Sequence, residues 1–94
     1  MPMAEISDSA VPRFAKGVRL QRDPVTGTNI LLYPEGIIEL NQTADAIVSH
    51  CDGRTFGEIV HALAEEYEAD SAALAADVRQ TLADLHGRSL IEFT

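Results

Sequence analysis

The sequence predicts an α+β domain with a winged-helix-like arrangement, in which a three-stranded antiparallel β-meander is followed by a cluster of three helices. Three observations support this prediction. Strand patterns occupy residues 18–40, helical periodicity follows in residues 42–86, and the connections between segments are short. Segregated strands and helices are typical of folds in which a small antiparallel sheet covers one side of the helices. With 94 residues, 46% of them hydrophobic, the chain is expected to form one domain.

Three short segments carry the strand patterns. Residues 18–22 alternate apolar and polar side chains, and residues 29–33 are apolar on both faces. Pro34 and Gly36 then form a tight turn, after which residues 36–40 return as a third strand. Because two apolar faces are typical of a covered strand, we predict that the second strand lies between the other two, which form the edges of the sheet.

Two helices are predicted directly after the third strand. Asn41 is a suitable N-cap for a helix over residues 42–51, and Asp52-Gly53 ends that helix. Thr55 followed by Glu58 forms a capping-box pattern at the start of the second helix, whose apolar face continues through three turns. Both helices therefore have a start signal in the sequence.

A third helix is predicted over residues 71–86. Asp70 or Ser71 caps its N-terminus, and Gly87 stands where the C′ residue needs a positive φ. The short link to the preceding helix makes the two a helix-turn-helix pair. Residues 89–93 are too few to establish a strand pattern, and we predict coil there.

The charges are distributed unevenly along the chain. The net charge of −8 has the wrong sign for binding nucleic-acid phosphates. Four of the seven basic residues lie near the N-terminus, at Arg13, Lys16, Arg19 and Arg22. Residues 1–12 have no sustained periodicity, so we predict a flexible tail outside the core and a single domain over residues 13–94.

The sequence shows no targeting or membrane-spanning pattern. The N-terminus lacks the basic and apolar regions of a secretory signal, and Cys51, the only cysteine, cannot form an internal disulfide. No apolar run approaches the roughly 20 residues that a transmembrane helix needs. A cytoplasmic protein without a membrane partner is therefore expected.

Two groups of side chains have the residue types of a metal site. Glu58, His61 and Glu65 share a face of the second predicted helix, but a carboxylate-bridged di-metal site needs a second such motif, so we interpret them as a solvated face. Residues 50–52 combine histidine, cysteine and aspartate without zinc-site spacing, and we interpret Cys51 as a small buried residue. No phosphate loop or catalytic triad signature occurs. We predict no enzymatic activity, no metal and no cofactor.

The helix-turn-helix pair suggests DNA binding, which requires a basic recognition helix. The third predicted helix instead exposes Asp77, Gln80 and Asp84, with Arg79 as its one well-placed cation. An acidic face is repelled by phosphates. No nucleic-acid partner is therefore expected.

The edge strand over residues 36–40 offers unpaired backbone groups to an extended peptide. Small side chains on the neighbouring third helix, at Ala72, Ala76 and Ala83, would let another chain approach closely. Alternatively, the N-terminal segment or a second copy of the protein covers this edge. Physical reasoning from the sequence leaves both interpretations open.

Several residue blocks have a specific order and spacing across residues 12–93. They are Val18-Arg19-Leu20 with Arg22-Asp23, Leu31 to Gly36, Leu40-Asn41 with Thr43-Ala44, Asp52-Gly53, Ile59-Val60 and Asp77-Val78. Together they resemble the PqqD family, the peptide chaperone of pyrroloquinoline quinone (PQQ) biosynthesis. Residues 1–11 match nothing in that pattern.

The resemblance implies a binding function. PqqD proteins bind the ribosomally made precursor peptide PqqA and present it to the radical S-adenosylmethionine enzyme PqqE, which links a glutamate and a tyrosine of the peptide through a carbon–carbon bond. The same winged-helix-like module recurs in other peptide-modifying systems. There the leader peptide adds as a strand in the groove between the third strand and the third helix.

Carried over to this chain, the resemblance implies a peptide groove with two walls. On the third strand its residues are Ile37, Ile38, Glu39 and Leu40. On the third helix they are Val78, Thr81, Leu82 and Leu85, with Asp77, Gln80 and Asp84 at the rim. The alternative interpretations are core packing for the apolar helix residues and a solvated surface for the rim.

Two further expectations concern partners. We expect the basic N-terminal part, with Arg19 and Arg22, to dock PqqE on a face apart from the groove; scattered surface charges are the alternative. A second hypothesis is an acidic helix-turn-helix assembly or regulatory domain that acts through dimerisation. The sequence leaves open whether the protein is a monomer or a homodimer with exchanged strands.

Overall fold

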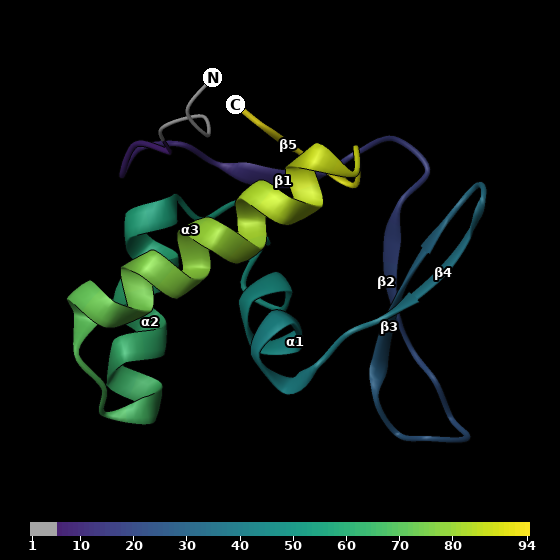
Figure 1. Ribbon diagram of the computed structural model, residues 1–94, viewed down its shortest axis with the longest axis horizontal. Coiled ribbons are helices and arrows are strands. Elements are labelled where there is room, and N and C mark those ends of the chain that lie inside the picture. Colours follow the sequence, from purple (N-terminus) through teal and green to yellow (C-terminus); the bar gives the residue numbers. More distant parts are fainter. Residues whose placement is uncertain (1–5) are drawn as a thin grey trace.

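The computed structural model describes residues 6–94, and the order of its elements is shown in Figure 1. The strands are β1 (Pro12–Phe14), β2 (Arg19–Arg22), β3 (Asn29–Tyr33), β4 (Gly36–Glu39) and β5 (Ile91–Phe93). The helices are α1 (Gln42–Val48), α2 (Phe56–Tyr67) and α3 (Ser71–Gly87). The predicted α+β class is confirmed. Among the described residues, no helix is both long and apolar enough to cross a membrane.

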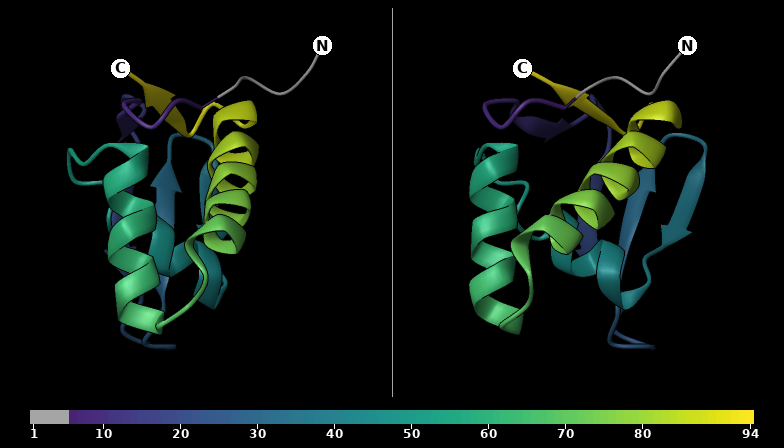
Figure 2. Two further views of the ribbon diagram at one scale, coloured as in Figure 1. Left: turned by 90° about the vertical axis from the view of Figure 1, so that its left-hand side faces the viewer. Right: turned by 60° about the vertical axis from the view of Figure 1, so that its left-hand side comes forward.

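Strands β2, β3 and β4 form an antiparallel sheet with β3 in the middle, as its two apolar faces predicted. The register sets Leu20, Leu31 and Ile38 side by side, and this inner face packs on the hydrophobic core. Because successive side chains of a strand alternate, the next row, with Leu32 in its middle, lies on the outer face. The helices lie on one side of this sheet (Figure 2).

The predicted capping signals are confirmed at the helix starts. Thr55 Oγ1 accepts a hydrogen bond from the Glu58 N–H at 3.1 Å, and Glu58 Oε1 accepts one from the Thr55 N–H at 2.8 Å, which completes the capping box. The Asn41 side chain accepts from the Ala44 N–H at 2.7 Å. The Asp70 carboxylate caps α3 in the same way. These local bonds begin each helix where the sequence indicated.

Helix α1 is shorter than predicted. It ends at Val48, and residues 49–51 form a turn instead of the last helical residues. The N–H groups of His50 and Cys51 donate to carbonyls three residues earlier, at 3.1 and 3.0 Å, which tightens the backbone beyond an α-helix. Gly53 then adopts a φ of 107°, which favours glycine and helps turn the chain toward α2.

Helix α3 ends later than predicted. It includes Gly87, and the positive φ falls on Ser89, at 63°. The Leu90 N–H donates to the Leu85 carbonyl at 3.0 Å and the Ser89 N–H to the His86 carbonyl at 2.9 Å, which is the bond pattern of a Schellman motif. Leu90 and Leu85 are both buried in the core. The predicted role of Gly87 is therefore wrong, because the return of Leu90 to the core determines where the helix ends.

Strands β1 and β5 form a second, two-stranded antiparallel sheet. Arg13 lies opposite Glu92, and two backbone hydrogen bonds of 3.0 and 3.1 Å between Val11 and Thr94 extend the pairing. The prediction of coil for residues 89–93 is wrong for residues 91–93, which form β5, and holds for residues 89 and 90. Three residues are too few to show a strand pattern, and their partner lies at the opposite end of the chain.

Residues 6–12 pack against the rest of the molecule, although the sequence predicted them outside the core. Ile6 is 6% exposed and belongs to the main hydrophobic cluster. Pro12 is buried and begins β1. The remainder of the predicted tail, residues 1–5, lies outside the described residues.

The same segment contacts the first turn of α2. The Ala10 carbonyl accepts a hydrogen bond from the Phe56 N–H at 2.7 Å, and the Asp8 carbonyl accepts one from the Gly57 N–H at 3.0 Å. The first N–H groups of a helix have no partner within that helix. The N-terminal segment therefore satisfies two polar groups of α2 while Ile6 enters the core.

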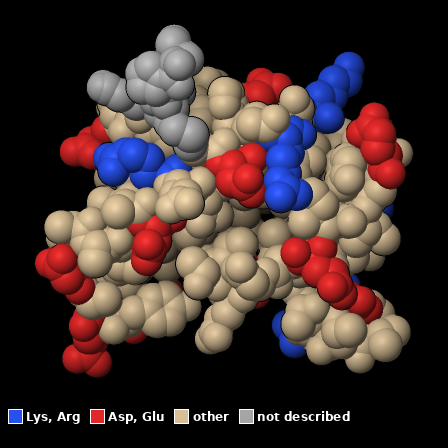
Figure 3. All heavy atoms as spheres, viewed as in Figure 1, with Lys and Arg blue, Asp and Glu red and all other residues tan. Residues whose placement is uncertain are grey.

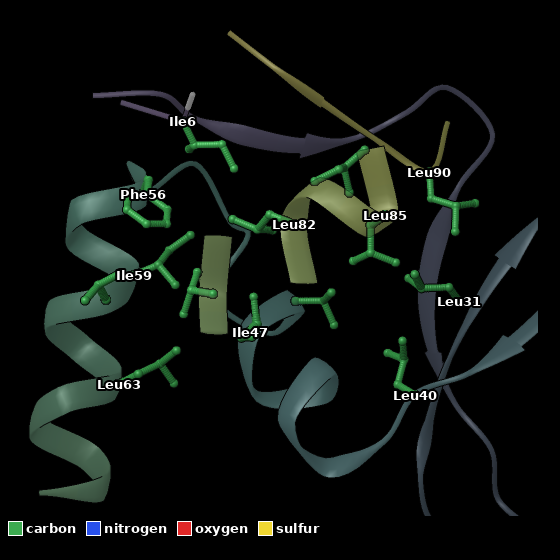
Figure 4. Close-up of a cluster of buried hydrophobic side chains, with 14 residues drawn as sticks. Ile6, Leu31, Leu40, Ile47, Phe56, Ile59, Leu63, Leu82, Leu85 and Leu90 are labelled. Atoms are coloured by element: carbon green, nitrogen blue, oxygen red, sulfur yellow. The ribbon is translucent and has the colours of Figure 1, made fainter. Parts of the chain in front are cut away.

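One cluster of buried side chains joins the inner face of the sheet, all three helices and both chain ends (Figure 4). Its buried members are Ile6, Leu31, Leu40, Ile47, Val48, Phe56, Ile59, Val60, Leu63, Val78, Leu82, Leu85, Leu90 and Ile91. Burial of apolar surface on this scale is the dominant favourable term in folding. The cluster therefore holds the sheet and the helices at a defined separation.

The burial of Ile6 generates a stability prediction. Replacing Ile6 with alanine removes buried methyl groups and leaves a cavity, so we expect the free energy of unfolding to fall by about 2–5 kcal/mol. Chemical denaturation of the full chain measures this change. Val25→Ala is the matched control, because Val25 is 90% exposed and its truncation should change stability by no more than about 0.5 kcal/mol. Equal effects of the two substitutions would contradict the burial of Ile6.

Candidate functional site

A groove of 630 Å³ lies between strand β4 and helix α3. Its residues come from β4, from the chain that enters α1 and from one side of α3. They are Ile38, Glu39, Leu40, Asn41, Thr43, Ala44, Asp77, Gln80, Thr81, Asp84, Leu85 and Arg88. The surface around a hollow between α3 and the sheet carries both acidic and basic side chains (Figure 3).

The strand wall of the groove is an open sheet edge. β4 is the last strand of the order β2-β3-β4, and among residues 6–94 no strand pairs with its other side. In an antiparallel ladder alternate residues exchange hydrogen bonds with the neighbouring strand, so every second residue of β4 turns its N–H and C=O toward the open edge. The edge therefore presents unpaired backbone donors and acceptors beside the groove.

The helix wall is a stripe along α3. Asp77, Thr81, Asp84 and Arg88 recur at helical spacing, which places them one above another on the same side of the helix. Arg88 Nε lies 3.3 Å from Asp84 Oδ2, with both side chains more than half exposed. An exposed pair of this kind contributes little to stability, so both groups can exchange partners.

The rim of the groove is predominantly acidic. Asp77 and Asp84 line it from the helix side, and Glu39 lines it at the end of β4, where the register places its side chain on the same face of the sheet as Ile37. Arg88 is its one basic residue, at the C-terminal end of α3. The floor is apolar where Leu40 and Leu85 reach the surface of the core. The groove thus combines backbone groups, a polar rim and an apolar base.

Most of the residues predicted for this groove line it. The strand contributes Ile38, Glu39 and Leu40, and the helix contributes Asp77, Gln80, Thr81, Asp84 and Leu85. Ile37 does not line it, because the register places Ile37 on the outer face, where it is 61% exposed. Val78 and Leu82 do not line it either, because both are fully buried in the core.

Four groove residues were missed by the sequence analysis: Asn41, Thr43, Ala44 and Arg88. The first three follow β4 directly and enter α1, so they extend the strand wall beyond the last paired residue. For Asn41 the sequence predicted only a role as helix N-cap, and the structure confirms that role. Arg88 is the C-cap residue of α3, four residues after Asp84, so it continues the spacing of the rim although it lies just outside the helix.

The two groups with metal-site residue types form no metal centre in the structure. Among residues 6–94, no cluster of three or more His, Cys, Asp or Glu side chains could hold a metal ion. Glu58 is used by the capping box, and His61 lies 3.6 Å from Glu65 on an exposed surface. His50 Nε2 lies 3.5 Å from Glu66 Oε1. Glu58, His61 and His50 thus each make a contact with a nearby group of the protein.

The Cys51 thiol is partly buried at the end of α1. Burial, and to a lesser degree the carboxylate of Asp52, raises its pKa from 9.0 to about 12. Its Sγ lies 3.6 Å from the Ile47 carbonyl and donates a weak hydrogen bond to it. The thiol therefore stays protonated at neutral pH, which is the opposite of what a nucleophilic cysteine requires.

Arg19 and Arg22 do not lie on the same face of the sheet. On β2, Arg19 lies opposite Leu32 and belongs to the outer face, whereas Arg22 lies opposite Asn29 on the inner-face side. Arg79, the one cation expected on the exposed side of α3, lies over the Phe56 ring at 4.9 Å from its centroid. In this cation–π contact the Arg79 guanidinium packs over the ring of a core residue.

Comparison with known proteins agrees with this architecture. The family model described as Coenzyme PQQ synthesis protein D (PqqD) matches residues 28–91. The PqqA binding protein of Rhizobium meliloti is 40% identical over 88 residues, which cover 93% of this chain and 90% of that protein. The solution NMR structure of the PqqD truncation of Methylobacterium extorquens PqqCD, a functional and stand-alone RiPP recognition element, has a TM-score of 0.81 and 38% identity, covering 98% of this chain and 99% of that one.

A longer relative differs in its length. The bifunctional coenzyme PQQ synthesis protein C/D of Methylorubrum extorquens is 39% identical over 87 residues. Those residues cover 92% of this chain and 23% of that protein. The present chain therefore spans about a quarter of the bifunctional relative, whereas it spans nearly all of the PqqA binding protein of Rhizobium meliloti.

The raised pKa of Cys51 generates a reactivity prediction. We expect iodoacetamide at pH 8 to modify Cys51 about a thousandfold more slowly in the folded protein than in urea, because the thiolate is the reactive form and its fraction falls with the raised pKa. The ratio of the modification rate in urea to that in the folded protein should fall as the pH rises from 9 toward 12. Asp52→Asn should accelerate the folded reaction slightly, since burial is the larger cause. Equal rates in the two states would show that the thiol is not protected.

Proposed function

This chain belongs to the PqqD family, and from that membership we propose that it binds the precursor peptide PqqA in the groove between β4 and α3. The observation that carries the proposal is the open edge of β4 along a groove with an apolar floor. A relative with 40% identity bears the name PqqA binding protein, which supports this ligand. The ligand class is thus an extended, ribosomally made peptide, and the cytoplasm, where such peptides are made, is the place of action.

The peptide binds by strand addition. Its backbone pairs with the outward-facing N–H and C=O groups of β4, and alternate side chains turn toward the groove floor at Leu40 and Leu85. Main-chain hydrogen bonds contribute about 0.5–1.5 kcal/mol each and are indifferent to sequence. Selectivity therefore depends on the side chains that meet the floor and the acidic rim.

The proposed role is non-catalytic presentation. The names of the relatives, a binding protein and a recognition element, support binding rather than chemistry. We extend the proposal to delivery of PqqA to the enzyme PqqE. In this proposal the folded peptide-binding unit begins before residue 13, because it includes Ile6. The alternative role as a helix-turn-helix assembly domain is not favoured, because these relatives are named for peptide binding and recognition.

PqqE docks on the outer face of the sheet in this proposal. Arg19, Leu32 and Ile37 form one cross-strand row there, so a positive charge lies beside apolar surface, and Ile37 is 61% exposed. This face is opposite the inner face of the same sheet, and the groove runs along the edge between the two. A partner on the outer face would therefore lie next to a peptide bound at β4 without competing for the groove floor.

Proline substitutions in β4 test the docking of PqqA. Of Ile37 and Ile38, one turns its N–H to β3 and the other to the open edge. Proline at the outward-facing position should lower PqqA affinity by about ten-fold or more with the fold intact, because proline removes the donor and is tolerated at sheet edges. Proline at the other position should lower unfolding stability, because it removes a ladder hydrogen bond.

Calorimetric titration with PqqA and thermal unfolding measure the two effects, so each variant serves as the control for the other. Wild-type affinity in both variants, with both proteins folded, would exclude strand addition at β4. The absence of heat with the unmodified protein would contradict PqqA as the ligand.

Charge reversal on β2 tests the docking of PqqE. Arg19→Glu should slow association with PqqE, because exposed charges steer encounter, and the effect should shrink when salt shortens the Debye length below about 8 Å. Arg22→Glu is the matched control, since it makes the same charge change on the inner-face side of β2. PqqA affinity should stay unchanged in both. Parallel losses for PqqA and PqqE, or no loss of PqqE association in either variant, would contradict docking on the outer face.

A further inference from the structure

A second, apolar cavity opens beside the groove among the three helices. Its volume is about 200 Å³. Side chains from all three helices form its wall: Ala46, Ile47, Leu63, Tyr67, Leu74 and Val78. Tyr67, the last residue of α2, is 51% exposed and is one of three large hydrophobic residues on the surface of the described chain. An apolar group that entered this cavity would remove apolar surface of its lining and of the Tyr67 ring from water.

The cavity adjoins the groove. Thr43, in the first turn of α1, and Asp77, on α3, line both. Thr43 follows the strand wall of the groove directly, four residues beyond the end of β4 at Glu39. A peptide that pairs with β4 and continues past Leu40 therefore reaches Thr43, with the apolar cavity on its far side.

We propose that this cavity holds one large apolar side chain, aromatic or branched aliphatic, of the peptide bound in the groove. The inference rests on the proposed peptide-binding function and adds the site that selects the peptide. Its size fits such a group, because an apolar cavity of about 150 Å³ in another protein holds a benzene molecule. The anchored residue lies at the end of the paired segment that is nearest to α1.

Two properties of the site favour a peptide side chain as the occupant. The groove itself has a mostly polar rim, and its backbone hydrogen bonds do not distinguish sequences, whereas the cavity is apolar on all but its rim. Thr43 and Asp77 line both the cavity and the groove, so a chain already held at β4 lies next to the cavity and needs to insert only one side chain. A peptide side chain bound in the cavity then fixes the register of the peptide strand on β4, which backbone hydrogen bonds alone do not fix.

The test fills the cavity from the protein side. Ala46→Leu places a larger side chain at the cavity wall without changing a groove residue, and we expect PqqA affinity to fall by about ten-fold or more. Ala76→Leu is the matched control, because Ala76 is exposed on α3 and lines neither the groove nor the cavity. Its PqqA affinity should equal that of the unmodified protein.

A second variant keeps the test independent of the folding of Ala46→Leu. Tyr67→Ala removes the half-exposed ring and should also lower PqqA affinity with thermal stability retained. Alanine replacement of each large apolar residue of PqqA should identify one position whose loss matters in the unmodified protein and no longer matters in Ala46→Leu.

The outcomes separate the two proposals. Unchanged PqqA binding by folded Ala46→Leu and Tyr67→Ala would overturn the anchor site and leave the proposed function standing. If no PqqA position coupled to Ala46→Leu, the anchor site would be overturned as well. Absence of PqqA binding by the unmodified protein would overturn the proposed function itself.

Discussion

Burial of one apolar stripe of α3 determines where the other parts of the molecule lie. Val78, Leu82 and Leu85 are buried in the centre of the core, so this helix is fixed in rotation as well as in position. The neighbouring stripe, which includes Asp77 and Asp84, consequently faces β4 and forms the wall of the groove. Rotation of α3 by a few tens of degrees would bury carboxylates and expose leucines, at a large cost in free energy.

The same stripe connects the chain ends to the core. Leu90 folds back beside Leu85 through the Schellman motif and leads into β5, which pairs with β1. β1 in turn is preceded by the segment whose carbonyls accept from the first turn of α2. The helix-turn-helix pair is thus closed at both ends by residues far away in the sequence. Among the edge strands of residues 6–94, β4 is the one that borders the groove beside α3.

An unpaired strand edge is an aggregation hazard that proteins usually restrict. β4 is only four residues long, and Glu39 places a charge at its end, so a second strand gains few hydrogen bonds without further contacts. The groove floor, the acidic rim and the adjoining apolar cavity can supply those contacts to a ligand of the right sequence. In the proposed function, weak pairing at the edge combined with side-chain selection is what lets the site discriminate between peptides.

Much of this protein was determined by the sequence alone. The central position of β3, the capping box of Thr55 and Glu58, and the order of sheet and helices all depend on local patterns or turn chemistry, which act over a few residues. Most of the groove residues were named in advance only because the blocks of the sequence resemble the PqqD family, which implies a groove between the third strand and the third helix. Only the tertiary structure decided the pairing of β1 with β5 and the burial of Ile6, because their partners are distant in the chain. It also decided that Val78 and Leu82 belong to the core and that Arg88 belongs to the groove. Helical spacing groups residues into stripes along the helix, but it does not say which stripe will face a distant strand.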